Sequence, residues 1–189
     1  MAVDPDNRKD TCGNKTSQDN ILERSKTNKC AGVTMKIPDE MLNILYGNYF
    51  GYVCTSDGSD QPHITPVFFV YEEPLQKIFF ITNEMSKKVK NILENPKVSI
   101  TVDIRDTKNP FNNEGIMAQG TAQITEKGPI YFLSEETLEL YRDIYMEFKG
   151  KYQAVIENRP MGENDVIVQI KIEKMVYWKG PHFKSIKLG

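Results

Sequence analysis

The chain has 189 residues, of which 39% are hydrophobic and 26% are charged, and its formal net charge is −2. This composition supports one domain-sized hydrophobic core and gives no excess of positive charge for nucleic acid or anionic lipid. No apolar run is long enough to cross a bilayer, and the first ten residues lack the hydrophobic segment of a secretory signal. We therefore expect a cytoplasmic protein with neither a nucleic-acid nor a membrane partner.

The N-terminal region differs in composition from the rest of the chain. Residues 1–33 are rich in Asp, Asn, Lys, Ser and Thr, and Ile21 and Leu22 are almost the only pair of large apolar residues among them. Such a segment buries too little apolar surface to offset the entropy lost on ordering. The sequence predicts a flexible N-terminal extension over residues 1–33, with a short docked helix around residues 21–25 as the alternative, and one folded domain over residues 34–189.

The first half of this domain reads as a helix followed by three strands. Pro38 and the acidic residues after it suit a helix start, and the apolar residues that follow predict a helix over residues 37–46. Three runs rich in aromatic and β-branched residues come next. These predicted strands cover residues 49–55, 64–71 and 77–82.

The second half alternates two helices with three further strands. Ser86 suits the N-cap of a short helix that ends at Asn95 and Pro96, and Ser134 opens a longer helix with apolar residues every three or four positions. Apolar and polar residues alternate over residues 98–104, 116–124 and 166–172. This order has too little strand–helix alternation for a Rossmann sheet and favours six antiparallel strands in a barrel.

Two adjacent lysines begin the short helix, where they meet the positive end of the helix dipole. Lys87 and Lys88 are unfavourable there unless an anion binds, because the first backbone amides of a helix also lack partners. The hydroxyls of Ser86 and Thr82 lie close by in sequence and can add hydrogen bonds to a phosphate. The alternative is that both lysines are solvated surface residues.

The same stretch carries a resemblance to a known family. Thr82, the sequence from Ser86 to Ile92, the Asn95-Pro96 pair and the alternating strand after it resemble the pyridoxamine 5'-phosphate oxidase-like flavin-binding split barrels. The resemblance covers about residues 37–178 and includes the segment at residues 63–67. It implies a mainly β fold, a six-stranded antiparallel split β-barrel of the FMN-binding type, that forms a homodimer with the cofactor at the subunit interface.

The resemblance also implies which residues contact the cofactor. The strand of Ile64, Thr65, Pro66 and Val67 would run beside the isoalloxazine, and Thr82, Ser86, Lys87 and Lys88 would hold the ribityl phosphate. Gln119 would reach the flavin with its polar side chain, and Trp178 would stack on the ring or lie at the interface. From the residues alone, Pro66 marks an edge strand or a bulge, Gln119 also fits a solvated strand position, and Trp178 also fits core packing.

No catalytic residue can be assigned from the sequence. His63 and His182 lack the second ligand or orienting carboxylate of a metal site or a triad, and no metal is expected. The main hypothesis is an FMN-dependent oxidoreductase that transfers hydride or electrons to an unidentified small molecule. The arginine-rich C-terminal signature of the true oxidase is absent, so its substrate is not expected. The alternatives are a deazaflavin-dependent reductase and a non-catalytic flavin- or haem-binding split-barrel protein.

Overall fold

The structure is a computed structural model that describes residues 36–125, 133–158 and 162–188. The prediction of a flexible extension over residues 1–33 lies outside the described residues. In the part that is described, the elements in chain order are α2 (Asp39–Gly47), β1 (Phe50–Ser56), β2 (Pro62–Phe68), β3 (Val70–Glu72), β4 (Lys77–Asn83), α3 (Lys87–Glu94), β5 (Lys97–Ile104), η1 (Pro110–Asn112), β6 (Glu114–Ile124), α4 (Glu135–Lys151), α5 (Gln153–Asn158), β7 (Asp165–Lys179) and β8 (His182–Lys187).

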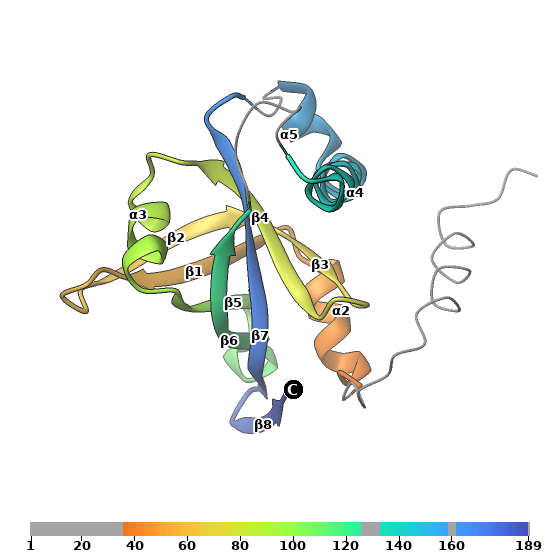
Figure 1. Cartoon of the computed structure of the whole chain (residues 1–189). Helices are drawn as coiled ribbons and strands as arrows, with labels where there is room; N and C mark the ends of the chain where they lie inside the picture. Colours follow the sequence, from red (N-terminus) through yellow and green to blue (C-terminus); the bar gives the residue numbers. More distant parts are fainter. Residues whose placement is uncertain (1–35, 126–132, 159–161, 189) are drawn as a thin grey trace, which may run out of the picture. The chain divides into compact units, whose positions relative to one another are not determined.

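The strands form one antiparallel sheet that curls into a half-barrel. The order across the sheet is β2-β1-β5-β6-β7-β4-β3, and β8 pairs with β7 beside this path. Figure 1 shows the curl, with α3 beside β1 and β2 and with α2 beside β3. The predicted fold class, mainly β with a few helices, is confirmed.

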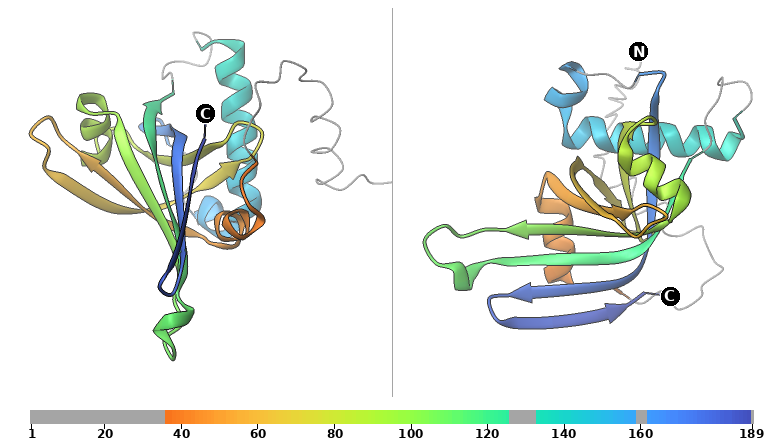
Figure 2. Two further views of the ribbon diagram at one scale, coloured as in Figure 1. Left: turned by 90° about the horizontal axis from the view of Figure 1, so that it is seen from below. Right: turned by 90° about the vertical axis from the view of Figure 1, so that its left-hand side faces the viewer.

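All six predicted strands form, and two differences raise the number of strands in the described sheet to eight. The run predicted over residues 64–71 divides into β2 and β3 at Phe69, whose amide donates to the hydroxyl of Tyr152 instead of to a neighbouring strand. The C-terminal residues turn at Gly180 and return as β8, which was not predicted. One side of β7 therefore pairs first with β4 and then with β8, and Figure 2 shows the β7–β8 hairpin.

The core lies inside the curl of the sheet. Strand residues alternate between this interior and the opposite face, so Val53, Ile100 and Ala118 are fully buried. The helix α2 adds four buried apolar residues from its inner side, and α4 packs through Ile144 and Phe148. None of the helices among the described residues is long and apolar enough to span a membrane.

The strand β2 lies at the edge of the sheet. It pairs with β1 on one side, and it ends the order of strands on the other. Pro62 and Pro66 both lie in it, and neither has a backbone N–H to donate. The prediction that Pro66 marks an edge strand is confirmed.

Candidate anion-binding site at the start of α3

The first turn of α3 combines unpaired amides with a buried hydroxyl. Ser86 occupies the predicted N-cap position, but its side chain makes no capping hydrogen bond. Its Oγ is buried and has no hydrogen-bond partner among the residues that the structure describes. An unpaired buried hydroxyl costs free energy, and the first amides of a helix have no partner within it. The N-terminus of α3 therefore presents donors for an acceptor from outside the chain.

Lys88 brings a positive charge to the same place. Its Nζ donates to Oγ1 of Thr82, at 2.9 Å, and Thr82 is itself buried near the end of β4. Burial lowers the pKa of Lys88 from its usual value. A neutral hydroxyl compensates a desolvated ammonium group only in part, so an anion beside Lys88 would stabilise its charged form.

Lys87 points to a different partner. Its Nζ lies 3.1 Å from Oδ2 of Asp57 in the turn between β1 and β2. Hydrogen bonds from Ser59 first, then from Lys87 and from the backbone of Gln61, hold the pKa of Asp57 well below its usual range. The carboxylate of Asp57 thus already neutralises part of the charge that was assigned to a phosphate.

The turn between β1 and β2 is joined to α3 at several further points. Oε2 of Glu94 accepts from the amide of Gly58, and Nδ2 of Asn95 donates to Oγ of Ser56, each at 2.8 Å. Deeper in the domain, Nδ2 of Asn91 donates to Oγ1 of Thr55, at 3.0 Å. These contacts hold the beginning of the edge strand β2 against the helix that carries Ser86 and Lys88.

Four of the predicted cofactor residues lie elsewhere, on the face of the sheet turned away from the core. We call this the outer face. Two rows of directly paired residues cross it: Pro66, Tyr52, Thr101, Met117 and Val176 form one row, and Ile64, Cys54, Ser99, Gln119 and Lys174 form the other. Trp178 follows Val176 by two residues and shares the face. Gln119 is exposed and lies opposite a bulge in β7, where Glu173 is the extra residue.

Thr65 and Val67 point to the opposite side of β2. Val67 is 7% exposed and belongs to the core, and Oγ1 of Thr65 lies 2.9 Å from Nε2 of His63. Trp178 is half-buried because its ring covers Gly115, where an added Cβ would lie 2.4 Å from Cζ2 of the ring. Only glycine accommodates such an approach of the indole.

The structure therefore divides the predicted site into two groups. Thr82, Ser86 and Lys88 gather at the start of α3, whereas Ile64, Pro66, Gln119 and Trp178 occupy the outer face. The sequence did not predict the contacts of Asp57 with Lys87 or of Asn91 with Thr55. The available signals were the Asp-Gly turn before β2 and the position of Asn91 on the short helix. Among the described residues no group of three or more His, Cys, Asp or Glu side chains is placed to hold a metal ion.

The first group fits a phosphate monoester. A phosphate has several strong acceptor oxygens, and the site offers an unpaired hydroxyl, a partly buried ammonium group and the free amides of a helix. These groups are hydrogen-bond donors and a positive charge, which together can bind an anion.

Comparison with known proteins identifies the relatives of this fold. The sequence model of the pyridoxamine 5'-phosphate oxidase family matches residues 37–179. No curated protein sequence matches the chain.

Solved structures with the same fold have low sequence identity to this chain. A heme binding protein from Mycobacterium smegmatis is 11% identical with a TM-score of 0.62, and the match covers 81% of this chain but 59% of that protein. A putative pyridoxamine 5'-phosphate oxidase from Listeria innocua is 17% identical with a TM-score of 0.53, covering 75% of this chain and 97% of the other. A FAD-binding protein from Mesorhizobium loti is 17% identical with a TM-score of 0.55, covering 76% and 96%. These likenesses confirm the split-barrel fold.

Proposed function

This chain belongs to the pyridoxamine 5'-phosphate oxidase family, and on that premise we propose that it is a flavoprotein that binds FMN with the ribityl phosphate at the start of α3. One observation carries the proposal: the buried, unpaired Oγ of Ser86 lies on the same helix turn as the partly buried ammonium group of Lys88. A phosphate would give the hydroxyl an acceptor and the ammonium group a counter-charge.

The residues around the phosphate have separable roles in this proposal. Ser86 donates a neutral hydrogen bond, Lys88 supplies charge, and Thr82 holds Nζ of Lys88 in position. Lys87 is shared with Asp57, which lies 3.1 Å away, and so contributes less than Lys88 to phosphate affinity. The β1–β2 turn, fixed to α3 through Glu94, keeps the edge strand beside the bound cofactor.

The proposed place for the isoalloxazine is along β2, beside the segment from Ile64 to Val67. Pro62 and Pro66 each remove one backbone donor from the edge strand, which suits the approach of a flat ring. Gln119 and Trp178 lie on the outer face, far across the sheet in pairing order from β2. We assign their contacts with the cofactor to the partner subunit of a homodimer.

The outer face supports this homodimer. Large apolar side chains remain exposed on it, with Tyr52 at 42%, Ile64 at 66% and Phe183 at 72% exposure. Apolar residues gathered on one face of a sheet are typical of a protein interface. Replacing Tyr52 by Glu should shift the protein from dimer to monomer in light-scattering chromatography, and replacing the exposed Leu93 of α3 by Glu should not. An unchanged dimer in the first variant would exclude this interface.

For the activity we propose oxidoreduction of a small molecule. A bound flavin supplies the electron-accepting chemistry, so the protein needs only to orient it, donate hydrogen bonds and control access. Rapid anaerobic mixing with NADH or NADPH should bleach the flavin. A flavin that stays oxidised would contradict the proposed activity and favour a flavin-binding protein that is not an oxidoreductase.

The cofactor itself is tested by purification without added flavin. The protein should be yellow, and mass spectrometry of the released cofactor should give FMN. Lys88→Met, which keeps most of the length of the side chain and removes its charge, should lose the colour, whereas Lys90→Met on the exposed side of the same helix should keep it. Colour retained equally in both variants would contradict the phosphate site.

The same spectrum distinguishes two other cofactors. A deazaflavin would absorb at shorter wavelength than FMN and would still depend on Lys88, because its tail is also anionic. A haem would give a Soret band that Lys88→Met leaves unchanged, and the fold shared with a heme binding protein is the reason to examine it.

A further inference from the structure

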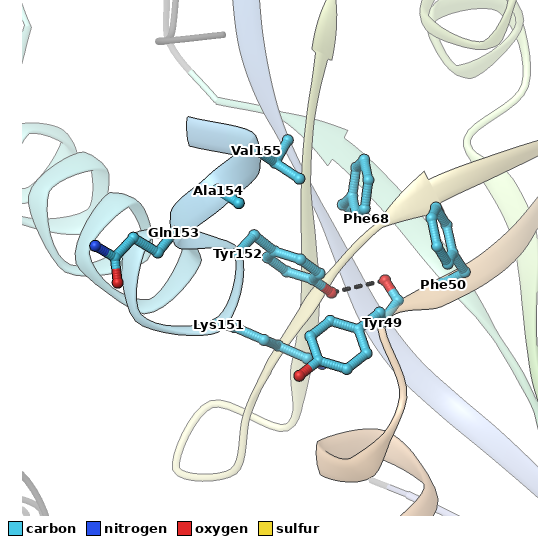
Figure 3. Close-up of a pocket in the computed structure, with 8 residues that line it drawn as sticks. All are labelled: Tyr49, Phe50, Phe68, Lys151, Tyr152, Gln153, Ala154 and Val155. Atoms are coloured by element: carbon cyan, nitrogen blue, oxygen red, sulfur yellow. Dashed lines mark hydrogen bonds between the residues drawn. The ribbon is translucent and has the colours of Figure 1, made fainter. Parts of the chain in front are cut away.

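A cavity lies away from the start of α3, where the beginning of β1 and the end of β2 meet the junction of α4 and α5. Its volume is about 230 Å³. Figure 3 shows the aromatic rings of Tyr49, Phe50, Phe68 and Tyr152 around it, with Lys151 below Tyr152 and beside Tyr49. Tyr49 and Phe50 are 58% and 53% exposed, which is high for aromatic residues in a cavity wall. The cavity is therefore open to solvent on one side.

Among the lining residues that the structure describes, Lys151 is the one cation. Its Nζ lies 3.3 Å from the carbonyl oxygens of Leu45 and Phe69, and it lies over the ring of Phe69, 4.4 Å from the centroid. Burial lowers the pKa of Lys151 to about 8. Within the described residues no carboxylate forms an ion pair with it.

Within the described part of the chain, the partners of Lys151 occupy two of its three hydrogen-bonding directions. An ammonium group has three donors, and the two carbonyl contacts are at the long end of the hydrogen-bonding range. Carbonyl dipoles and aromatic faces attract a cation, but they do not neutralise it. Gln153 offers no competing polar group, because its amide donates to Glu157 and points away from the cavity in Figure 3.

We propose that this cavity binds a small planar aromatic carboxylate, with its ring among Phe50, Phe68 and Tyr152 and its carboxylate at Nζ of Lys151. Aromatic walls favour a flat ring through edge-to-face and offset contacts, and the walls here already pack in this way, with Phe68 and Tyr152 5.0 Å apart at 67°. A carboxylate accepts a charge-assisted hydrogen bond from the ammonium group and neutralises it.

The size of the cavity limits the ligand to about one ring. Pockets for drug-sized ligands begin at roughly 300 Å³, and this cavity is smaller. A flavin or a haem does not fit within it, so this site is distinct from the proposed cofactor site and does not depend on flavin binding. For a ligand of nine heavy atoms we expect a dissociation constant on the order of a millimolar.

The test is an NMR titration of the full-length protein with benzoate, and in parallel with benzyl alcohol, which has the same ring but no charge. Benzoate should shift the amide signals of Tyr49, Phe50 and Tyr152, and it should bind at least tenfold more tightly than benzyl alcohol. Lys151→Met should abolish that difference by weakening benzoate about tenfold. Lys149→Met, an exposed lysine two residues earlier on the same helix, should leave it unchanged.

Three results would overturn the proposal. The first is equal affinity for benzoate and benzyl alcohol in the natural protein, a comparison that needs no variant to fold. The second is benzoate shifts that lie elsewhere or are absent. The third is a dependence of the Tyr49 and Phe50 signals on protein concentration without ligand, which would mean that a second copy of the chain covers the cavity.

Discussion

Lys88 and Lys151 are both lysines whose pKa is lowered by burial, yet their surroundings differ in kind. Lys88 donates to the hydroxyl of Thr82 at a helix start, and Lys151 donates to two backbone carbonyls under aromatic rings. One of those carbonyls belongs to Leu45, in the last turn of α2, where a cation is favourable. Lys151 therefore has a structural role that Lys88 lacks.

The comparison teaches that partial burial of a lysine does not by itself indicate a binding site. At Lys88 the neighbouring Ser86 hydroxyl is also unsatisfied, so two polar groups favour the same phosphate. At Lys151 the polar neighbours are satisfied, and the shape and aromatic lining of the cavity select the ligand. Each site should consequently respond to its own substitution.

The largest expected effect is that the affinities for FMN and for benzoate change independently of each other. Lys88→Met should weaken FMN binding about ten- to a hundredfold, about 1.5 to 3 kcal/mol, because a charged hydrogen bond to phosphate is lost. It should leave benzoate affinity unchanged, and Lys151→Met should do the reverse. Calorimetric titration of both variants with both ligands measures this, and loss of both ligands in either variant would mean that the sites are not independent.

The second effect concerns stability at the aromatic cavity. The hydroxyl of Tyr152 accepts from the amide of Phe69, at 3.1 Å, and lies 2.5 Å from the carbonyl oxygen of the same residue. Tyr152→Phe leaves that buried amide without a partner, so it should lower the free energy of unfolding by about 2 kcal/mol. Urea denaturation measures the change, with Tyr49→Phe as the control at an exposed hydroxyl.

The third effect is a pH dependence of stability that comes from Lys151. The pKa of Lys151 is about 8 in the folded protein, against an ordinary value of 10.5 in the unfolded chain. The folded state therefore binds the proton less tightly. The resulting destabilisation is fully present below about pH 8 and disappears as the pH rises to about 10.5. Because Lys151 is partly exposed, we expect about 1 kcal/mol.

Denaturation of the natural protein and of Lys151→Met at pH 7.5 and pH 10.5 isolates the contribution of Lys151 to the pH dependence of the free energy of unfolding. Between these two pH values the free energy of unfolding of the natural protein should rise by about 1 kcal/mol relative to that of the variant. The variant lacks the hydrogen bonds to Leu45 and Phe69 at both pH values. Their loss therefore changes the difference in stability equally at both pH values and does not change how that difference depends on pH. A constant difference between the two proteins would show that Lys151 titrates near its usual pKa.

The smallest effect on stability is expected at Ser86. Because its Oγ is buried and has no partner in the described part of the chain, Ser86→Ala removes an uncompensated desolvation cost and should raise the free energy of unfolding only slightly, by about 0.5 kcal/mol. The same substitution should weaken FMN binding severalfold. A variant that loses more than about 1 kcal/mol of stability while FMN affinity is unchanged would assign the hydroxyl a structural role instead.

The same contrast explains which parts of the site were predictable from sequence. Thr82, Ser86 and Lys88 come together through one short turn, so local patterns are enough to place them near one another. The strands and the three predicted helices also follow from local periodicity, although α5 and β8 were not predicted.

The aromatic cavity depends on contacts that no local pattern encodes. Lys151 reaches Leu45 across 106 residues, and Tyr152 reaches Tyr49 across 103. The sequence pattern predicts that a lysine near the end of an amphipathic helix is solvated, and only tertiary packing buries it. Lys87 shows the same limit, because its partner Asp57 is 30 residues away and two adjacent lysines cannot be told apart by sequence.

The edge position of β2 has a consequence for how copies of this protein meet one another. An unpaired strand edge is a template on which another chain can add a strand and begin to aggregate. Pro62 and Pro66 interrupt that template, and the bonds from Glu94 and Asn95 hold the preceding turn to α3. Copies should therefore not extend the sheet by pairing at β2, which protects this edge from the strand addition that begins fibril formation at high concentration.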